Sequence, residues 1–388
     1  MVSPLNRRIR RLKLIVIVAI LLYAIRYTLY AYSAQESNYI RVAIIQDTVS
    51  LRLKINGLYE VIDSASNRSL SQGRYLNTTV TAYKYGILLG SIKANTNRLL
   101  IKPKASGSVV INGRRFRGDI QLIKKDNLHL LAVNYIELED YIQGILYHEA
   151  SHYWPIEALK AQAIVCRTYA AYQIGENKSK DYDVTSDIYS QVYGGKTSER
   201  YRTNKAVAQT KGQILTYQDK IFPAYFHATC GGHTEEARLL WNIDMPPLRG
   251  VTCGFCRASP HFRWHCVLDL KEIADKLTQS GYKIDNIQDI DTLDIDKSGR
   301  AINLKFVSDN GELKISTKDF RHIFGPSIIR STNFKVKVID HDAVFEGFGW
   351  GHGVGLCQWG AYFMAKTGSN AEEIIQYYYP GSQITTLN

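Results

Sequence analysis

One carboxylate of the chain stands among aromatic side chains, between two expected helices. The segment 147–155 reads YHEASHYWP and places Glu149 beside two tyrosines, a tryptophan and two histidines. Partial burial against such rings disfavours the ionised carboxylate and raises its pKa. A carboxylic acid tuned in this way can protonate a leaving oxygen near neutral pH. A single Glu before a helix is more often a solvated residue, so the assignment needs support from the rest of the chain.

The same segment has a second interpretation as a zinc-hydrolase helix. His148, Glu149 and His152 approach the pattern H-E-x-x-H, but the second histidine comes one residue too early. Because that motif needs both histidines on one helical face, the match is poor. A metalloprotease or amidase is kept only as a third alternative.

A glycine-rich run lies near the end of the chain. Five glycines alternate with other residues from Gly347 to Gly355, and His352 and Gln358 lie in or directly after this run. Glycine lets a ligand or another backbone approach closely, which makes His352 and Gln358 candidate substrate ligands. The alternative is a tight structural loop. A phosphate loop is excluded, because the required Lys and Ser/Thr are missing.

Paired cysteines predict a metal site. His227 and Cys230 form H-x-x-C, and Cys253 and Cys256 form C-x-x-C, which together give four ligands of the zinc type. His233 is an alternative to His227. Four protein ligands make a closed, structural zinc site. Disulfides remain the competing interpretation if the chain is exported, whereas a redox motif would require a thioredoxin-like context that is missing.

The N-terminus predicts export. The chain has 388 residues and a net charge of +12, and five cations precede an apolar run over 14–25. Basic residues stay on the cytoplasmic side, so the rest of the chain should lie outside the cell. Residues 1–35 are a membrane anchor, or a signal peptide cleaved before Ala34. No arginine-rich patch alternates with aromatics, which argues against a nucleic-acid partner.

The remaining pattern predicts an α+β fold. Residues 36–135 contain short runs rich in Val, Ile, Leu and Tyr separated by turn signals, which indicates a β-rich subdomain. Residues 136–388 read as a mixed α/β domain that carries all the chemistry. Helices are expected over Leu138–Leu146, from Pro155 through Ala170, over Arg202–Thr210 and Leu268–Leu277, and from Ala371 onward.

Several motifs follow one another in a recognisable order. They are Glu149 with Trp154–Ala163, Arg167–Ala170, Gln191–Gly195, His227 with Cys230, Gly349–Gly355 and Tyr378–Gly381. In this order they resemble the stage II sporulation protein D family, which is related to the amidase enhancers. The resemblance extends from about Ile40 to Leu387. Cys357 departs from the family pattern, because a serine is common there.

The resemblance implies a lytic transglycosylase that cleaves peptidoglycan glycan strands and leaves a 1,6-anhydro sugar. It implies that Glu149 is the catalytic acid/base and that the H-x-x-C contributes to a zinc site. It also implies that the glycine-rich loop lines the substrate cleft with His352 and Gln358, and that Gln191 and Tyr193 lie near it. The expected partners are glycan strands, the membrane and a partner hydrolase. A non-catalytic wall-binding amidase enhancer remains the alternative.

One carboxylate is chemically sufficient for such a reaction. Ordinary glycosidases need a second carboxylate as base or nucleophile. When the C6 hydroxyl of the sugar itself attacks, the nucleophile is already positioned within the substrate. Glu149 can then protonate the leaving oxygen and take up the C6 proton, while a neutral group such as Gln358 steadies the transition state.

Overall fold

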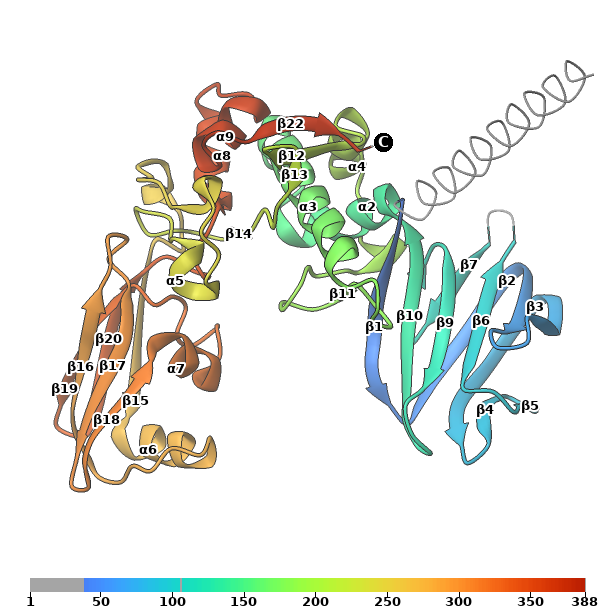
Figure 1. The fold of residues 1–388 in the computed structure, drawn as a ribbon, viewed down its shortest axis with the longest axis horizontal. Helices are drawn as coiled ribbons and strands as arrows, with labels where there is room; N and C mark the ends of the chain where they lie inside the picture. Colours follow the sequence, from blue (N-terminus) through green and yellow to red (C-terminus); the bar gives the residue numbers. More distant parts are fainter. Residues whose placement is uncertain (1–37, 105–106, 388) are drawn as a thin grey trace, which may run out of the picture. The chain divides into compact units, whose positions relative to one another are not determined.

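The computed structural model describes residues 38–104 and 107–387 (Figure 1). The expected N-terminal anchor or signal segment lies outside these residues. Within them, no helix combines the length and the apolar character needed to cross a membrane. The chain forms two compact units: residues up to Tyr141 with Gln173–Thr197, and Ile142–Tyr172 with Ser198–Leu387. The expected mixed fold is confirmed, with a β-rich sheet first and an α/β region after it.

The first unit is built on an eleven-stranded sheet with the main order β11-β1-β10-β9-β6-β2-β3-β4-β5 (Figure 1). Strand β7 also pairs with β2, and β8 pairs with β7. The strands are β1 (Tyr39–Thr48), β2 (Ser50–Asp63), β3 (Arg68–Tyr83), β4 (Gly86–Leu89), β5 (Ile92–Ala94), β6 (Arg98–Pro103), β7 (Ser108–Ile111), β8 (Arg114–Phe116), β9 (Asp119–Lys124), β10 (Leu130–Glu137) and β11 (Val184–Thr185).

Buried and exposed side chains alternate along β2, which forms a long hairpin with β3. In β2, Leu51, Leu53 and Ile55 are buried, whereas Arg52 and Lys54 between them are exposed. This period of two buries one face of the sheet and leaves the other in water. Antiparallel pairing of β2 with β3 fixes the register.

Two helices carry the chain from the sheet into the second unit. Helix α2 (Leu138–Glu149) has two acidic residues in its first turn, which suits the positive end of the helix dipole. Helix α3 (Ile156–Glu176) follows Pro155, and from Ala158 to Ala170 every side chain except that of Lys160 is buried. Cys166 is fully buried there. Helix α2 ends at Glu149, and a short loop connects it to α3.

The second unit joins distant segments of the chain. Strand β14 (Phe226–His227) pairs in parallel with β21 (Leu356–Cys357), although about 130 residues separate them. A second sheet has the order β13-β12-β22. The other elements are η1 (Gly195–Ser198) of the first unit, and α4 (Tyr201–Gln209), β12 (Gln213–Tyr217), β13 (Lys220–Ile221), α5 (Ala237–Trp241), η2 (Pro246–Leu248), η3 (Phe255–Ala258), α8 (Gln358–Lys366), α9 (Ala371–Tyr378) and β22 (Gln383–Thr386).

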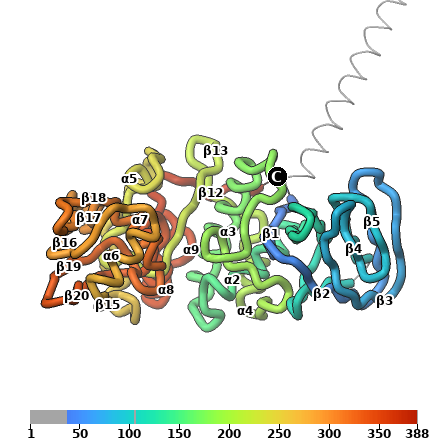
Figure 2. Tube along the Cα trace, turned by 90° about the horizontal axis from the view of Figure 1, so that it is seen from below, coloured from blue at the N-terminus to red at the C-terminus, as the bar shows by residue number. Residues whose placement is uncertain are grey.

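A module with its own core is inserted between β14 and β21. This inserted module, Arg263–Phe348, contains two three-stranded sheets, β15-β20-β19 and β16-β17-β18. Figure 2 shows its strands and helices gathered in one lobe. A separate apolar cluster, centred on Phe306, Phe320 and Phe345, holds it together. Its elements are β15 (Arg263–Asp269), α6 (Leu270–Gln279), β16 (Ile287–Ile295), β17 (Ala301–Ser308), β18 (Gly311–Ser316), α7 (Thr317–Phe324), β19 (Phe334–Ile339) and β20 (Asp342–Phe348).

Candidate functional site

The β14–β21 ladder brings the H-x-x-C motif beside the glycine-rich run. His227 is opposite Cys357 in the ladder, and Thr229 forms a bridge with Trp350. Gly349 has φ +81°, and a Cβ there would lie 2.5 Å from the carbonyl oxygen of Thr229. Only glycine allows both this conformation and this approach. The alternating glycines therefore let two backbones pack closely at the centre of the unit.

Glu149 lies at the end of α2 and is half-buried. The side chain of Gln358, the first residue of α8, donates a hydrogen bond from Nε2 to the backbone carbonyl of Glu149 at 2.9 Å. Gln358 itself is 8% exposed. The structure thus brings two of the predicted site residues together. The contact of Gln358 fixes the backbone of Glu149, and a direct contact with substrate remains a prediction.

The loop after Glu149 is held on both sides. Arg202 donates from Nε to the carbonyl of His152 at 2.8 Å and from Nη2 to the carbonyl of Trp154 at 2.9 Å. The guanidinium of Arg200 lies 4.4 Å from the ring centroid of Tyr147. A double hydrogen bond from one guanidinium restricts the loop, because the planar fork has little freedom. The position of Glu149 is therefore set from both flanking segments.

The zinc-hydrolase alternative finds no support in this geometry. The Nε2 of His148 is 2.6 Å from the Oγ of Ser198, and the ring of His152 stacks against Tyr153 with centroids 3.9 Å apart. In the part of the chain that the structure describes, the one group arranged for a metal ion consists of cysteines and lies elsewhere.

His352 packs among rings. Its Nδ1 accepts a hydrogen bond from the backbone N–H of Val354 at 3.1 Å, and its ring lies 5.1 Å from Trp241 and 5.6 Å from His227. Burial and the neighbouring His227 lower the pKa of His352 well below its usual value. A neutral imidazole suits the binding of an uncharged ligand, but the substrate contact predicted for His352 remains a prediction.

Gln191 and Tyr193 belong to the first unit and are buried, with exposed fractions of 0% and 1%. The hydroxyl of Tyr141 donates to the Oε1 of Gln191 at 3.0 Å, and the hydroxyl of Tyr193 donates to the Oδ1 of Asn134 at 2.7 Å. These are the contacts of packing residues, because the polar ends point into the protein interior. The predicted role in substrate binding stays a prediction.

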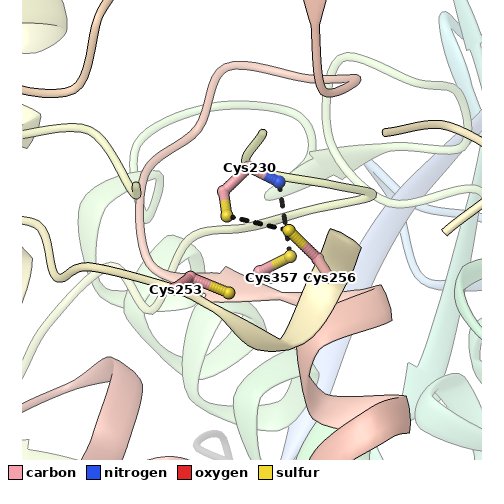
Figure 3. Close-up of side chains that lie close together, drawn as sticks. All are labelled: Cys230, Cys253, Cys256 and Cys357. Carbon is pink, nitrogen blue, oxygen red and sulfur yellow. Dashed lines mark hydrogen bonds between the residues drawn. The ribbon is translucent and has the colours of Figure 1, made fainter. Parts of the chain in front are cut away.

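Four cysteines form the candidate metal centre. Cys230, Cys253, Cys256 and Cys357 are fully buried, and their sulfur atoms all lie within 4.8 Å of one another (Figure 3). The Sγ atoms of Cys230 and Cys256 are 3.4 Å apart, and all cysteines are free thiols. A tetrahedral zinc ion with Zn–S bonds of about 2.3 Å separates its sulfur ligands by about 3.8 Å. The donor set and its spacing therefore fit a closed zinc site.

Backbone N–H groups and a phenol support these sulfurs. The Sγ of Cys357 accepts from the N–H of Cys230 at 3.3 Å and from that of Gly360 at 3.4 Å. The Tyr378 hydroxyl lies 3.2 Å from the Sγ of Cys253. The Cys230 and Cys256 thiols lower the pKa of Cys253, whereas burial raises the pKa of Cys357. A metal ion held by these four cysteines would remove this competition, because all four sulfurs would then be thiolates.

The predicted ligand set changes at one position. Three of the predicted ligands, Cys230, Cys253 and Cys256, are in the group, and the fourth member is Cys357 in place of His227. The Nδ1 of His227 is 3.1 Å from the carbonyl of Val354, so that its ring is engaged with the glycine-rich run. Burial, with the nearby charge of Arg300, lowers the pKa of His227 to about 3.

A buried arginine of the inserted module lies under the glycine-rich run. Arg300 is 1% exposed and donates from Nη2 to the carbonyl of Cys230 at 2.7 Å and from Nη1 to the carbonyl of His233 at 3.0 Å. A Cβ on Gly353 would lie 2.6 Å from its Cζ, so glycine is required there. Arg300 thus connects the inserted module to both the glycine-rich run and the cysteine group.

A carboxyl pair lies beside this arginine. Glu235 is 3% exposed, its backbone N–H donates to the carbonyl of Gly353 at 2.9 Å, and its carboxyl accepts from the hydroxyl of Ser298 at 3.1 Å. Burial and a hydrogen bond with Asp296 raise the pKa of Glu235 to about 8. Burial by itself raises the pKa of Asp296. Hydrogen bonds with Glu235 and Ser298 outweigh this effect, so that the pKa of Asp296 is lowered.

Two family descriptions match the chain. "Stage II sporulation protein" matches residues 126–217, which contain Glu149, and a domain of unknown function (DUF8618) matches residues 252–355, which contain the inserted module. Stage II sporulation protein D of Bacillus subtilis (strain 168) is 31% identical over 269 residues, which are 66% of this chain and 76% of that protein. The chain belongs to the stage II sporulation protein D family.

Other relatives extend the similarity. An uncharacterised protein of Brachyspira hyodysenteriae is 33% identical over 362 residues, covering 93% of this chain and 96% of that protein. The amidase enhancer of Bacillus subtilis is 26% identical over 366 residues, covering 82% of this chain and 51% of that protein. The similarity therefore includes the inserted module as well as the segment around Glu149.

Proposed function

We propose that this protein is a lytic transglycosylase that cuts the glycan strands of peptidoglycan between N-acetylmuramic acid and N-acetylglucosamine. The observation that supports it most is the hydrogen bond from Gln358 to the backbone of Glu149, which joins the start of α8, three residues after the glycine-rich run, to the residue that carries a half-buried carboxyl group. The relatives named stage II sporulation protein D and amidase enhancer favour a role in cell-wall remodelling or sporulation.

In the proposed reaction Glu149 acts twice. Its carboxyl group protonates the glycosidic oxygen as the bond to C1 of N-acetylmuramic acid breaks. The C6 hydroxyl of the same sugar then forms a bond to C1, and the Glu149 carboxylate takes up the C6 proton, so that the enzyme returns to its starting state. No water is consumed. Glu149 itself is half-buried, and Tyr147 and Trp154 flank it in sequence.

The cysteine group is proposed to hold one structural zinc ion. Four protein sulfurs leave no open coordination position, so the ion would stabilise the fold and would not act on the substrate. Cys357 directly precedes Gln358, and its Sγ also accepts a hydrogen bond from the N–H of Gly360 at the start of α8. The cysteine ligands therefore hold the same turn that positions Gln358 against Glu149.

The place of action is also a proposal. The basic residues and apolar run of the N-terminal segment favour an extracytoplasmic enzyme attached to the cell membrane, or secreted if the segment is cleaved. Peptidoglycan glycan strands lie on that side of the membrane, which agrees with the proposed substrate.

Digestion of purified glycan strands tests the reaction. Wild type should release products with 1,6-anhydro ends, identified by mass spectrometry, and Glu149→Gln should release none while still binding the strands. Glutamine keeps the shape of the side chain but carries no transferable proton. Equal product from both proteins, or products with reducing ends, would contradict the mechanism.

A second candidate function is a non-catalytic wall-binding protein that enhances an amidase. The similarity to the amidase enhancer over 82% of this chain favours it. Under this alternative, glycan strands bind without turnover and the activity of a partner hydrolase rises equally with wild type and Glu149→Gln. The same two proteins therefore separate the two candidates.

A further inference from the structure

A row of rings leads from the loop after Glu149 toward the inserted module. The ring centroids of Trp154 and Trp359 are 5.2 Å apart, and those of Trp359 and His261 are 6.2 Å apart. The next step, from His261 to Trp350, is 4.8 Å. All four side chains are half-buried, so each ring keeps part of its surface in water. The row therefore connects the loop after Glu149 with residues next to the inserted module.

A cation lies at the far end of this row. The guanidinium of Arg330 lies 4.7 Å from the ring centroid of Trp350, and its own backbone carbonyl accepts a hydrogen bond from the N–H of Gly351 at 2.9 Å. The side chain is half-buried and forms no ion pair in residues 38–104 and 107–387. A guanidinium held against an indole and left without a carboxylate is available to donate hydrogen bonds to a ligand.

His261 is fixed at the same place by its backbone and its neighbours. Its N–H donates to the Oγ of Ser259 at 3.1 Å, and the carbonyl of the next residue, Phe262, accepts from the N–H of Gly349 at 2.9 Å. Burial and the charge of Arg330 lower the pKa of His261, which favours the neutral form of the imidazole. A neutral ring with a hydrogen-bonding edge is well suited to a sugar.

We propose that His261, Trp350 and Arg330 form a distal sugar-binding subsite, through which the inserted module holds a glycan strand extending away from Glu149. This inference rests on the proposed function, because it assumes that the strand passes the carboxyl group. Flat rings pack against the apolar face of a pyranose, and the guanidinium donates to an N-acetyl carbonyl or a carboxylate oxygen. His261 lies two residues before the module and Arg330 lies within it, so the module would set the length of strand that binds.

Oligosaccharide binding tests the subsite apart from the reaction. Titration calorimetry on Glu149→Gln with the N-acetylglucosamine trisaccharide and hexasaccharide should show tighter binding of the hexasaccharide. His261→Ala and Arg330→Ala in this background should weaken hexasaccharide binding about tenfold, which corresponds to 1.4 kcal/mol, and leave trisaccharide binding within about twofold. Arg330→Gln is a second variant, which keeps a polar side chain without the charge, if alanine impairs folding.

Alanine substitutions of another histidine and of a lysine serve as controls. His265 and Lys337 are exposed residues of the inserted module, and alanine at either should change neither affinity. The subsite would be overturned if the substitutions weakened trisaccharide and hexasaccharide binding equally. It would also be overturned if Glu149→Gln bound both oligosaccharides with the same affinity, or bound neither. Failure of the proposed function gives a different result, because wild type and Glu149→Gln would then release the same products whatever the binding data show.

Discussion

Gln358 donates a hydrogen bond from its side chain to the backbone carbonyl of Glu149 across 209 positions of the sequence, with a length of 2.9 Å. Gln358 begins α8 directly after Cys357, whose Sγ accepts from the N–H of Gly360 as the helix cap. The cysteine group, the start of α8 and the end of α2 are therefore connected through two successive residues. Through this connection, an ion held by the four cysteines would influence the position of the proposed acid without touching it.

Substitution of Gln358 by leucine should lower the rate of glycan cleavage by about ten- to hundredfold, because a small displacement of an acid from its substrate costs a factor of this size. The free energy of unfolding should fall by about 1–2 kcal/mol, since the carbonyl of Glu149 loses its donor. Product release per enzyme and chemical denaturation measure the two effects.

Gln376→Leu is the matched control for this prediction. The Nε2 of Gln376 also donates to a backbone carbonyl, that of Ser382, at 2.9 Å. Its substitution should cost similar stability and leave the cleavage rate unchanged. A Gln358→Leu protein that retains the wild-type rate would contradict the positioning role.

The zinc content of the protein should depend on Cys357 and not on His227. Protein purified without added metal should contain about one zinc ion per chain. Cys357→Ser should lose most of the ion and unfold at a lower temperature, whereas His227→Ala should keep it. Elemental analysis measures the content, and Cys266→Ser, at a cysteine outside the group, controls for thiol loss. Retention of zinc by Cys357→Ser with its loss from His227→Ala would restore the ligand set expected from sequence.

Spacing in the sequence predicts only part of the cysteine group. Cys230, Cys253 and Cys256 were predicted because they occur in short motifs with metal-ligand spacing. Cys357 has no cysteine near it in sequence, and it joins the group only through the parallel pairing of β14 with β21. Its occurrence where relatives commonly have serine was the one available signal. Long-range pairing of two-residue strands leaves no pattern that a reader of the sequence could detect.

Local signals account for the helices that were predicted. Asn370 caps α9 through a reciprocal capping box with Glu373, which is visible in the sequence. Helix α8 was missed because glycines dominate the residues before it and its cap is a cysteine. Helix α7 was not among the expected helices, although Ser316 and Asp319 form a local cap.

Loss of Arg300 should destabilise the protein more than most substitutions. Arg300→Met leaves the carbonyls of Cys230 and His233 without a donor, and we expect the free energy of unfolding to fall by about 2–4 kcal/mol. Gly353→Ala should be comparable, because the new Cβ would clash with the guanidinium at φ +90°. Gly175→Ala is the control, since its Cβ meets nothing within 4 Å inside α3 and should stabilise by about 0.5–1 kcal/mol. Denaturation of the three variants measures these values, and an Arg300→Met protein as stable as wild type would contradict the prediction.

The carboxyl pair should make stability depend on pH in a defined direction. Burial and the hydrogen bond with Asp296 raise the pKa of Glu235 to about 8, above its unfolded value of 4.5. Between these values the folded protein holds a proton that the unfolded chain has released, so the contribution of Glu235 is full below pH 4.5 and is lost as the pH rises through 8. Glu235→Gln keeps an uncharged hydrogen-bonding group and should remove this loss. Chemical denaturation at pH 5, 6.5 and 8 compares the two proteins, with Glu346→Gln as an exposed control. A decline with pH that is equally steep in Glu235→Gln would show that other groups cause it.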